Sequence, residues 1–261
     1  MRKLSAKAET QSSTPSRQRM QVIERASRVL RSLEGQASGL SLSEIAKATG
    51  LPRSTVQRIV GALEAEQFVI SATPKARVVL GPALLRLAAS VKIDIVGLAS
   101  PAMQQLSAET GETVDLSVLQ GTSAVFVHQL SGRHRLRAVS AVGESFPLHC
   151  TACGKALLAV AGADLMSALT DRQLPAYTAN TITDVSELRA NIASFNGKGL
   201  CYDNEEHAEG ISAIGTAFID PMGRKYAVSV PLPTLRYDKM RERLEKSLIR
   251  CRNQIIDAMG I

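Results

Sequence analysis

The segment SLSEIAKATGLPRSTVQRIVGAL at residues 41–63 constrains the fold most tightly, because it encodes two short helices joined by a sharp turn. Ser41 and Glu44 have the spacing of a capping box, which predicts that a helix begins there. Gly50 suits the left-handed conformation that ends a helix, and Pro52 suits the first turn of the next helix. The segment therefore predicts a helix-turn-helix, with an ordinary polar-faced helical hairpin as the alternative.

The second helix of this pair has an apolar stripe and a polar face. Its apolar residues recur at helical spacing and should be buried. The polar face carries hydrogen-bonding and charged side chains, namely Arg53, Ser54, Thr55, Gln57 and Arg58. Such side chains can reach base edges and phosphates when a helix lies in the major groove of DNA. These residues are the predicted DNA-reading set.

The flanking segments predict the rest of a winged helix. An apolar stripe from Met20 predicts a first helix that ends near Gly35. The segment FVISATPKARVVL at residues 68–80 has two apolar runs around a turn, which predicts a β-hairpin with Lys75 and Arg77 near its tip. Basic residues on such a wing commonly contact phosphates. We expect the winged helix-turn-helix to span residues 20–81, after a disordered basic tail at residues 1–19.

The charge of the chain is concentrated in this N-terminal part. Residues 1–80 contain 13 Lys and Arg against 6 Asp and Glu, a net charge of +7, whereas residues 81–261 contain 18 of each. This asymmetry favours a basic module that binds nucleic acid or, less often, an anionic membrane surface. The longest apolar runs are too short to span a bilayer, and residues 1–20 contain no apolar signal core. We therefore expect a cytoplasmic protein with no membrane partner and with reduced thiols.

The neutral part predicts an α+β domain with a mostly antiparallel sheet. We expect a linker helix within residues 82–98, beginning at Pro82, and an effector-binding domain at residues 99–261 whose first helix covers 99–109. Hairpins are predicted at 113–132 and 213–233, with a further strand at 136–143. Further helices are predicted at about 154–161, 163–169, 185–198 and 239–259.

Residues 147–159, PLHCTACGKALLA, place His149, Cys150 and Cys153 at the start of a predicted helix. With Cys201 and one of His149, Asp203 or His207, these cysteines have ligand types acceptable for zinc, although a lone C-x-x-C lacks the second pair of a structural zinc motif. A lowered pKa of Cys153 at the helix start is the basis for an alternative thiol switch. The simplest interpretation is buried thiols that fill space, with no metal and no cofactor.

The run Asp203, Glu205, Glu206 and His207 has the residue types of acid–base catalysis. Contiguous charges more often form an exposed loop, and no activated nucleophile accompanies them. We therefore expect no catalytic residues and no enzyme. Lys155 is expected to be structural or solvated, with a contact to an anionic ligand as the alternative.

Three separated motifs carry a resemblance that covers nearly the whole chain from about Met20. The helix-turn-helix, the PLHCTACGKALLA segment and YDNEEHAEGISAIG at residues 202–215 resemble, in their order and distances, the IclR family of bacterial transcriptional regulators. The resemblance implies a winged helix that reads double-stranded DNA, a linker helix that helps to dimerise it, and a GAF-like domain that binds a small organic effector. It also implies homodimers or homotetramers on a partly palindromic operator.

The resemblance also implies the positions of an effector pocket. Backbone N–H groups of Ala152 and Cys153 would face the ligand, and the start of a helix does attract anions. The other matching positions are Phe146, as an apolar wall, together with Asp203, Ile211, Ala213 and Ser229. Pro231 departs from the family pattern, in which a small polar residue is common. We expect a regulator, a repressor rather than an activator, whose operator affinity is altered by a small organic acid.

Overall fold

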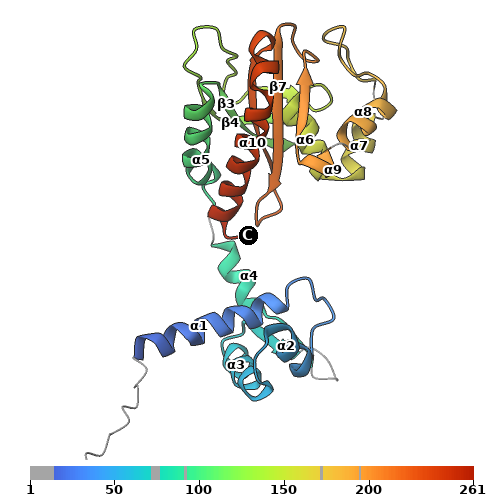
Figure 1. Ribbon diagram of the computed structural model, residues 1–261. Helices are drawn as coiled ribbons and strands as arrows, with labels where there is room; N and C mark the ends of the chain where they lie inside the picture. The colour runs from blue at the N-terminus through green and yellow to red at the C-terminus, as the bar shows by residue number, and fades with distance from the viewer. Residues whose placement is uncertain (1–14, 72–76, 91–92, 171–172, 194) are drawn as a thin grey trace, which may run out of the picture. The chain divides into compact units, whose positions relative to one another are not determined.

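The computed structural model describes residues 15–71, 77–90, 93–170, 173–193 and 195–261. The chain divides into two compact units, residues 1–93 and residues 94–261 (Figure 1). Within the described residues, no helix has both the length and the apolar composition that crossing a membrane requires.

The first unit is a winged helix-turn-helix. Its elements are α1 (Pro15–Ser32), α2 (Leu42–Thr49), α3 (Arg53–Ala65), the antiparallel hairpin of β1 (Val69–Ser71) and β2 (Val78–Leu80), and α4 (Pro82–Ala89). The predicted capping box is present, because the Glu44 N–H donates to Ser41 Oγ and the Ser41 N–H donates to the Glu44 carboxylate. Gly50 takes the left-handed conformation with φ 68°. A small apolar core joins α1, α2, α3 and the hairpin, and it includes Val29, Ile45 and Val56.

The second unit is an α+β domain, as predicted. In the described part of the chain its sheet has six strands in the order β5-β4-β3-β8-β7-β6, and every neighbouring pair is antiparallel. The strands are β3 (Val114–Gln120), β4 (Ser123–Leu130), β5 (Ser145–Pro147), β6 (Cys201–Asn204), β7 (Ile211–Ile219) and β8 (Lys225–Pro233).

Helices cover both faces of this sheet (Figure 1). On one face, α5 (Ile95–Thr110) and α10 (Thr234–Met259) enclose a core that includes Met103, Ile214 and Leu248. On the other face, α6 (Ala152–Ala161) packs on β7 and β8. The remaining helices, α7 (Ala163–Thr170), α8 (Val185–Ala193) and α9 (Phe195–Lys198), lie in the same part of the chain, and α6 contacts each of them. Because side chains alternate along a strand, Ile214 and Ala213 lie on opposite faces of the sheet.

Several predicted helix boundaries were wrong. α1 already includes Pro15, inside the predicted tail, and the rest of that tail, residues 1–14, lies outside the described residues. The predicted linker helix ends at Ala89, and α5 already begins at Ile95, because the Asp94 carboxylate caps it by accepting from the Gly97 N–H at 3.0 Å. α10 begins at Thr234, before the predicted start at residue 239. The helix predicted at 185–198 corresponds to α8 and α9, and residue 194 between them lies outside the described residues.

The strand predicted at residues 136–143 is also wrong, because this segment is a loop. The loop runs from 131 to 144, and β5 pairs with β4 in its place. Thr113 Oγ1 donates to the Ala138 carbonyl at 2.7 Å, and the Arg236 guanidinium donates to the Leu136 carbonyl at 2.9 Å. These backbone acceptors are therefore bonded to side chains, and a strand ladder is not needed to satisfy them.

Candidate functional site

The residues predicted to bind an effector meet at one cavity of the second unit. This cavity has a volume of about 390 Å³, and we name it the effector pocket after that prediction. It is lined by every residue of the predicted set, namely Phe146, Ala152, Cys153, Asp203, Ile211, Ala213 and Ser229. They come from β5, α6, β6, β7 and β8, which are far apart in the sequence. The fold therefore brings the predicted set together.

The register of the sheet places the floor of the pocket. Asp115 on β3 lies opposite Ser229 on β8, and Ala213 on β7 lies between Pro231 on β8 and Asp203 on β6. All of these side chains line the effector pocket. Pro231, the departure from the family pattern, adds an apolar ring to the floor and has no N–H to donate.

The first turn of α6 forms a second wall, and two glycines let it approach. A Cβ on Gly215 would lie 2.7 Å from the Ala152 carbonyl carbon, and a Cβ on Gly154 would lie 2.5 Å from Leu148 Cα. The Thr151 side chain caps the helix, because its Oγ1 accepts from the Gly154 N–H at 3.1 Å. The N–H groups at the very start of a helix have no acceptor within the helix, so this wall suits an anion.

Two buried carboxyl groups face the same cavity. Burial raises the pKa of Asp203 to about 7 and the pKa of Asp115 to about 6. Asp203 accepts from the Glu206 N–H at 2.8 Å, and Asp115 accepts from Gln129 Nε2 at 2.7 Å. At neutral pH these groups can therefore accept a hydrogen bond or, when protonated, donate one. Sequence reasoning missed Asp115, although a lone aspartate within the apolar strand TVDLSV was a usable signal.

Aromatic rings form the remaining wall. The ring centroids of Phe126 and Phe146 are 4.7 Å apart, and those of Phe146 and His207 are 5.1 Å apart. Burial and the neighbouring His149 lower the pKa of His207, so its ring is neutral at neutral pH. Only zinc ligation or catalysis was considered for His207 from the sequence, whereas the structure places it in the effector pocket.

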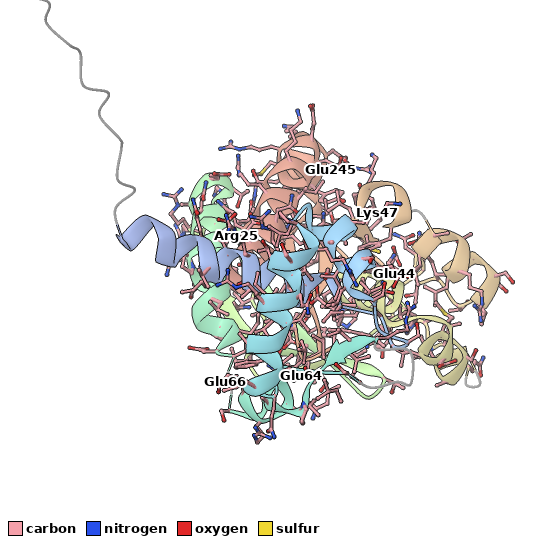
Figure 2. The ribbon with its side chains drawn as sticks, turned by 90° about the horizontal axis from the view of Figure 1, so that it is seen from below. Arg25, Glu44, Lys47, Glu64, Glu66 and Glu245 are labelled. Atoms are coloured by element: carbon pink, nitrogen blue, oxygen red, sulfur yellow. The ribbon has the colours of Figure 1, made fainter. Side chains whose placement is uncertain are left out.

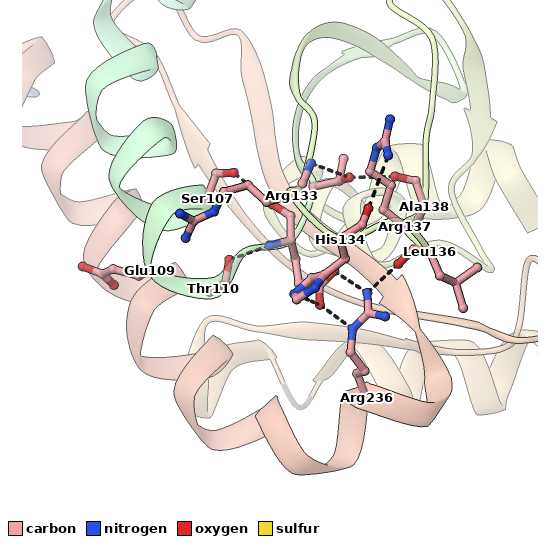
Figure 3. Close-up of polar contacts among 12 residues, drawn as sticks. Ser107, Glu109, Thr110, Arg133, His134, Leu136, Arg137, Ala138 and Arg236 are labelled. Carbon is pink, nitrogen blue, oxygen red and sulfur yellow. Dashed lines mark hydrogen bonds and ion pairs between the residues drawn. The ribbon is translucent and has the colours of Figure 1, made fainter.

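The loop at 131–144 closes one side of the pocket, where Arg137 and Ser140 are lining residues that the sequence did not indicate. Figure 3 shows the base of this loop, where Arg236 reaches from α10 toward Leu136. Arg236 also pairs with the fully buried Glu112 carboxylate through two hydrogen bonds of 2.7 and 2.8 Å. Arg236 thus anchors the loop to a buried charge.

Lys155 lies one turn into α6 and is fully buried, so it is not solvated. Its Nζ donates to both carboxylate oxygens of Glu206, at 2.6 and 2.7 Å. Glu206 is only 4% exposed, which contradicts the expected exposed loop at that position. Because Asp203 accepts from the Glu206 N–H, the ion pair holds the β6–β7 turn beside the pocket.

The cysteines considered for the alternative sensor sites are buried. Burial raises the pKa of Cys150 to about 12, of Cys153 to about 11 and of Cys201 to about 12. The lowered pKa considered for Cys153 is therefore wrong, because desolvation outweighs the helix start. Among the described residues, no group of three or more His, Cys, Asp and Glu side chains is placed to hold a metal ion.

The predicted DNA-reading face is exposed on α3. Arg53, Ser54, Gln57 and Arg58 are exposed, and Thr55 is half-buried. Figure 2 shows Glu64 and Glu66 at the C-terminal end of this helix. The positive charge of α3 is therefore near its N-terminus, where the helix dipole is also positive, and this arrangement suits contact with phosphates.

The wing differs from its prediction in one respect. The guanidinium of Arg77 donates to the Gly39 carbonyl at 3.0 and 2.8 Å and pairs with Glu44 at 3.2 Å. Arg77 thus ties the hairpin to the turn before α2, and its contact with DNA stays a prediction. Lys75 lies outside the described residues, so its predicted contact stays a prediction as well.

Comparison with known proteins identifies the class of both units. The IclR helix-turn-helix domain matches residues 22–70, and the domain described as bacterial transcriptional regulator IclR C-terminal matches residues 87–257. The HTH-type transcriptional regulator Rv1719 of Mycobacterium tuberculosis is 44% identical over 218 residues, 84% of either chain. These matches are transcriptional regulators, not enzymes.

Solved structures that resemble this chain also include IclR-family regulators. The crystal structure of an ICLR transcriptional regulator from Silicibacter sp. TM1040 has a TM-score of 0.80 and 25% identity, covering 92% of this chain and 96% of that chain. An IclR homolog from Microbacterium hydrocarbonoxydans, complexed with 4-hydroxybenzoate, has a TM-score of 0.60 over 92% of this chain and 99% of that chain. Its 22% identity supports the fold alone. The chain belongs to the IclR family of bacterial transcriptional regulators and is a DNA-binding regulator.

Proposed function

We propose that this regulator is a repressor whose affinity for an operator changes when a small organic acid binds in the effector pocket. One observation carries the proposal. The residues that match effector-binding positions of the family come from five separate elements, and all of them line one cavity beside the start of α6. A repressor acts by occupying DNA, so operator binding and ligand binding are the two activities it requires. Because it would act on chromosomal DNA, we propose that it is located in the cytoplasm.

The lining of the pocket supports a planar acid as the ligand. A carboxylate would accept from the N–H groups of Ala152 and Cys153 at the start of α6. A ring would lie against Phe146 and His207, and a hydroxyl group would bond to Asp203 or Ser229. The 4-hydroxybenzoate bound by the Microbacterium hydrocarbonoxydans homolog has this combination of groups, and it is a suitable first probe.

We propose that the ligand acts through a dimer or a tetramer on a partly palindromic operator. Leu85 and Leu87 of α4 are 75% and 55% exposed, and apolar side chains of this size favour a contact between copies. The ligand would favour one arrangement of the paired effector units and so change the spacing of the two α3 helices.

The test is a selection of genomic fragments by the full-length protein at two salt concentrations, with and without 4-hydroxybenzoate and related aromatic, keto and sugar acids. The proposal predicts enrichment of a short palindromic site, and one class of acid that changes this enrichment. Binding that is only salt-sensitive and lacks a motif under every condition would contradict it. Asp203→Ala and Ser229→Ala should each abolish the effect of the acid and leave operator binding in place.

A further inference from the structure

A second cavity lies beside the effector pocket, and neither the comparisons nor the proposed function assigns it a role. Its volume is about 450 Å³. Most of the described residues around it are apolar or aromatic, among them Phe146, Leu148, His149, Leu169, Leu174 and Tyr177, and the polar ones are Thr122, Ser123, Ser145 and Gln173. Phe146 lines both cavities, so we call this space the second chamber.

The chemistry of the second chamber differs from that of the effector pocket. The effector pocket has Asp115, Asp203 and Arg137 in its lining, whereas none of the residues described around the second chamber is Asp, Glu, Lys or Arg. His149 is 2% exposed, and its Nε2 donates to the Pro175 carbonyl at 2.9 Å. The described side chains around the chamber therefore offer no charged partner, and burying a charge without a partner is costly.

The wall between the two cavities consists of rings. The centroid of His207 is 5.1 Å from that of Phe146 and 5.2 Å from that of Tyr177, and Tyr177 is 6.0 Å from His149. Phe146 and His207 line the effector pocket, while Phe146, Tyr177 and His149 line the second chamber. The wall is one side chain thick at Phe146, so a shift of this ring alters both spaces.

We propose that the second chamber binds an uncharged aromatic molecule, and that Phe146 transmits its occupation to the effector pocket. Rings at offset or tilted geometry favour another ring as their neighbour, and the apolar lining removes that ring from water. The proposal goes beyond the proposed function, and it holds whichever acid occupies the effector pocket.

Calorimetric titration of the full-length protein with indole, phenol and biphenyl-4-ol tests the site. We expect at least one of these neutral probes to bind with a Kd of about 0.1–1 mM, a value suited to small ligands of this size. Ala168 and Thr122 are exposed residues at the rim of the chamber, so Ala168→Trp and Thr122→Trp should fill the chamber and leave the fold intact. Each should weaken binding at least about tenfold, while Ala168→Ser should change it less than about twofold.

Two further arms locate the probe. Ser229→Leu fills the effector pocket only and should leave the affinity of the neutral probe within about threefold. The chain has 4 histidines, so the His207 ring signal can be resolved by NMR. The bound probe should shift this signal in the native protein, and Phe146→Leu should abolish the shift.

These results separate the possibilities. Loss of binding in Ser229→Leu but not in the two tryptophan variants would place the probe in the effector pocket and overturn the proposal. So would the absence of binding by all three probes up to their solubility, or equal binding of cyclohexanol. A bound probe that leaves the His207 signal unchanged would overturn the coupling through Phe146. None of these readouts requires the acid, so failure of the proposed function would be recognised separately.

Discussion

Replacing Lys155 by methionine should destabilise the second unit strongly. Lys155 is fully buried, and its Nζ lies 2.6 and 2.7 Å from the carboxylate oxygens of Glu206, which is 4% exposed. The substitution leaves the Glu206 carboxylate buried without its cation, and removing one partner of a buried pair typically costs about 3–5 kcal/mol. This cost is a large part of the free energy of unfolding of a typical domain, which is about 5–15 kcal/mol.

The assay is unfolding in urea, monitored by tyrosine fluorescence. The chain has 4 tyrosines and no tryptophan, and all of the tyrosines, Tyr177, Tyr202, Tyr226 and Tyr237, belong to the second unit. The signal therefore reports on that unit alone, which avoids the ambiguity of unfolding two domains together. Lys246→Met is the matched control, because Lys246 Nζ is also 2.6 Å from a glutamate, Glu242, but both side chains are exposed. This control should have no measurable effect.

A double-mutant cycle tests whether the ion pair causes the loss of stability in Lys155→Met. If the pair is the source of the loss, Lys155→Met combined with Glu206→Gln should be more stable than the sum of the single losses predicts. Strictly additive losses of unfolding free energy would refute the conclusion that this ion pair holds the β6–β7 turn. So would a loss of stability in Lys155→Met no larger than that in Lys246→Met.

Four further predictions concern the pocket, its titration, the thiols and the DNA face. Gly215→Ala should abolish stabilisation by the acid in thermal melts while operator binding persists, because the new Cβ would lie 2.7 Å from the Ala152 carbonyl carbon; retained stabilisation would contradict the role of the α6 start. Because burial raises the pKa of Asp203 from 3.8 to about 7, its protonation stabilises the folded state fully below pH 3.8, and this contribution is lost as the pH rises from about 4 to 7. Urea midpoints should therefore fall less steeply over that range in Asp203→Asn than in the native protein, and identical slopes would exclude the shift. Cys153 should resist iodoacetamide at pH 8 in the folded protein and react after unfolding, as mass spectrometry would show; rapid reaction of the native thiol would revive the switch. Arg58→Ala should weaken operator binding by about 1–3 kcal/mol in fluorescence anisotropy if this arginine reads a base, and unchanged affinity would remove it from the groove.

The helix-turn-helix was predictable because its signals are local. A capping box acts over three residues, and a left-handed glycine ends a helix by its own backbone freedom, so Ser41, Glu44 and Gly50 specify their conformations without the rest of the chain. The strand prediction failed because distant partners decide the conformation of that segment. Residues 136–143 have the composition of a strand, but Thr113 and Arg236 bond to their carbonyls and hold them as a loop.

The candidate pocket divides in the same way. The resemblance identified residues at the start of α6 and on four strands. The sequence by itself determined the class of protein and the alternation of side chains along those strands. Strand register places Asp115 opposite Ser229 in the site, and Arg137 lines it because distant residues anchor its loop, which no local pattern encodes. The burial of Lys155 against Glu206, the raised pKa of Cys153 and the second chamber behind Phe146 were likewise decided by tertiary structure. Desolvation and long-range contacts depend on what the whole fold packs around a group, and a stretch of sequence does not contain that information.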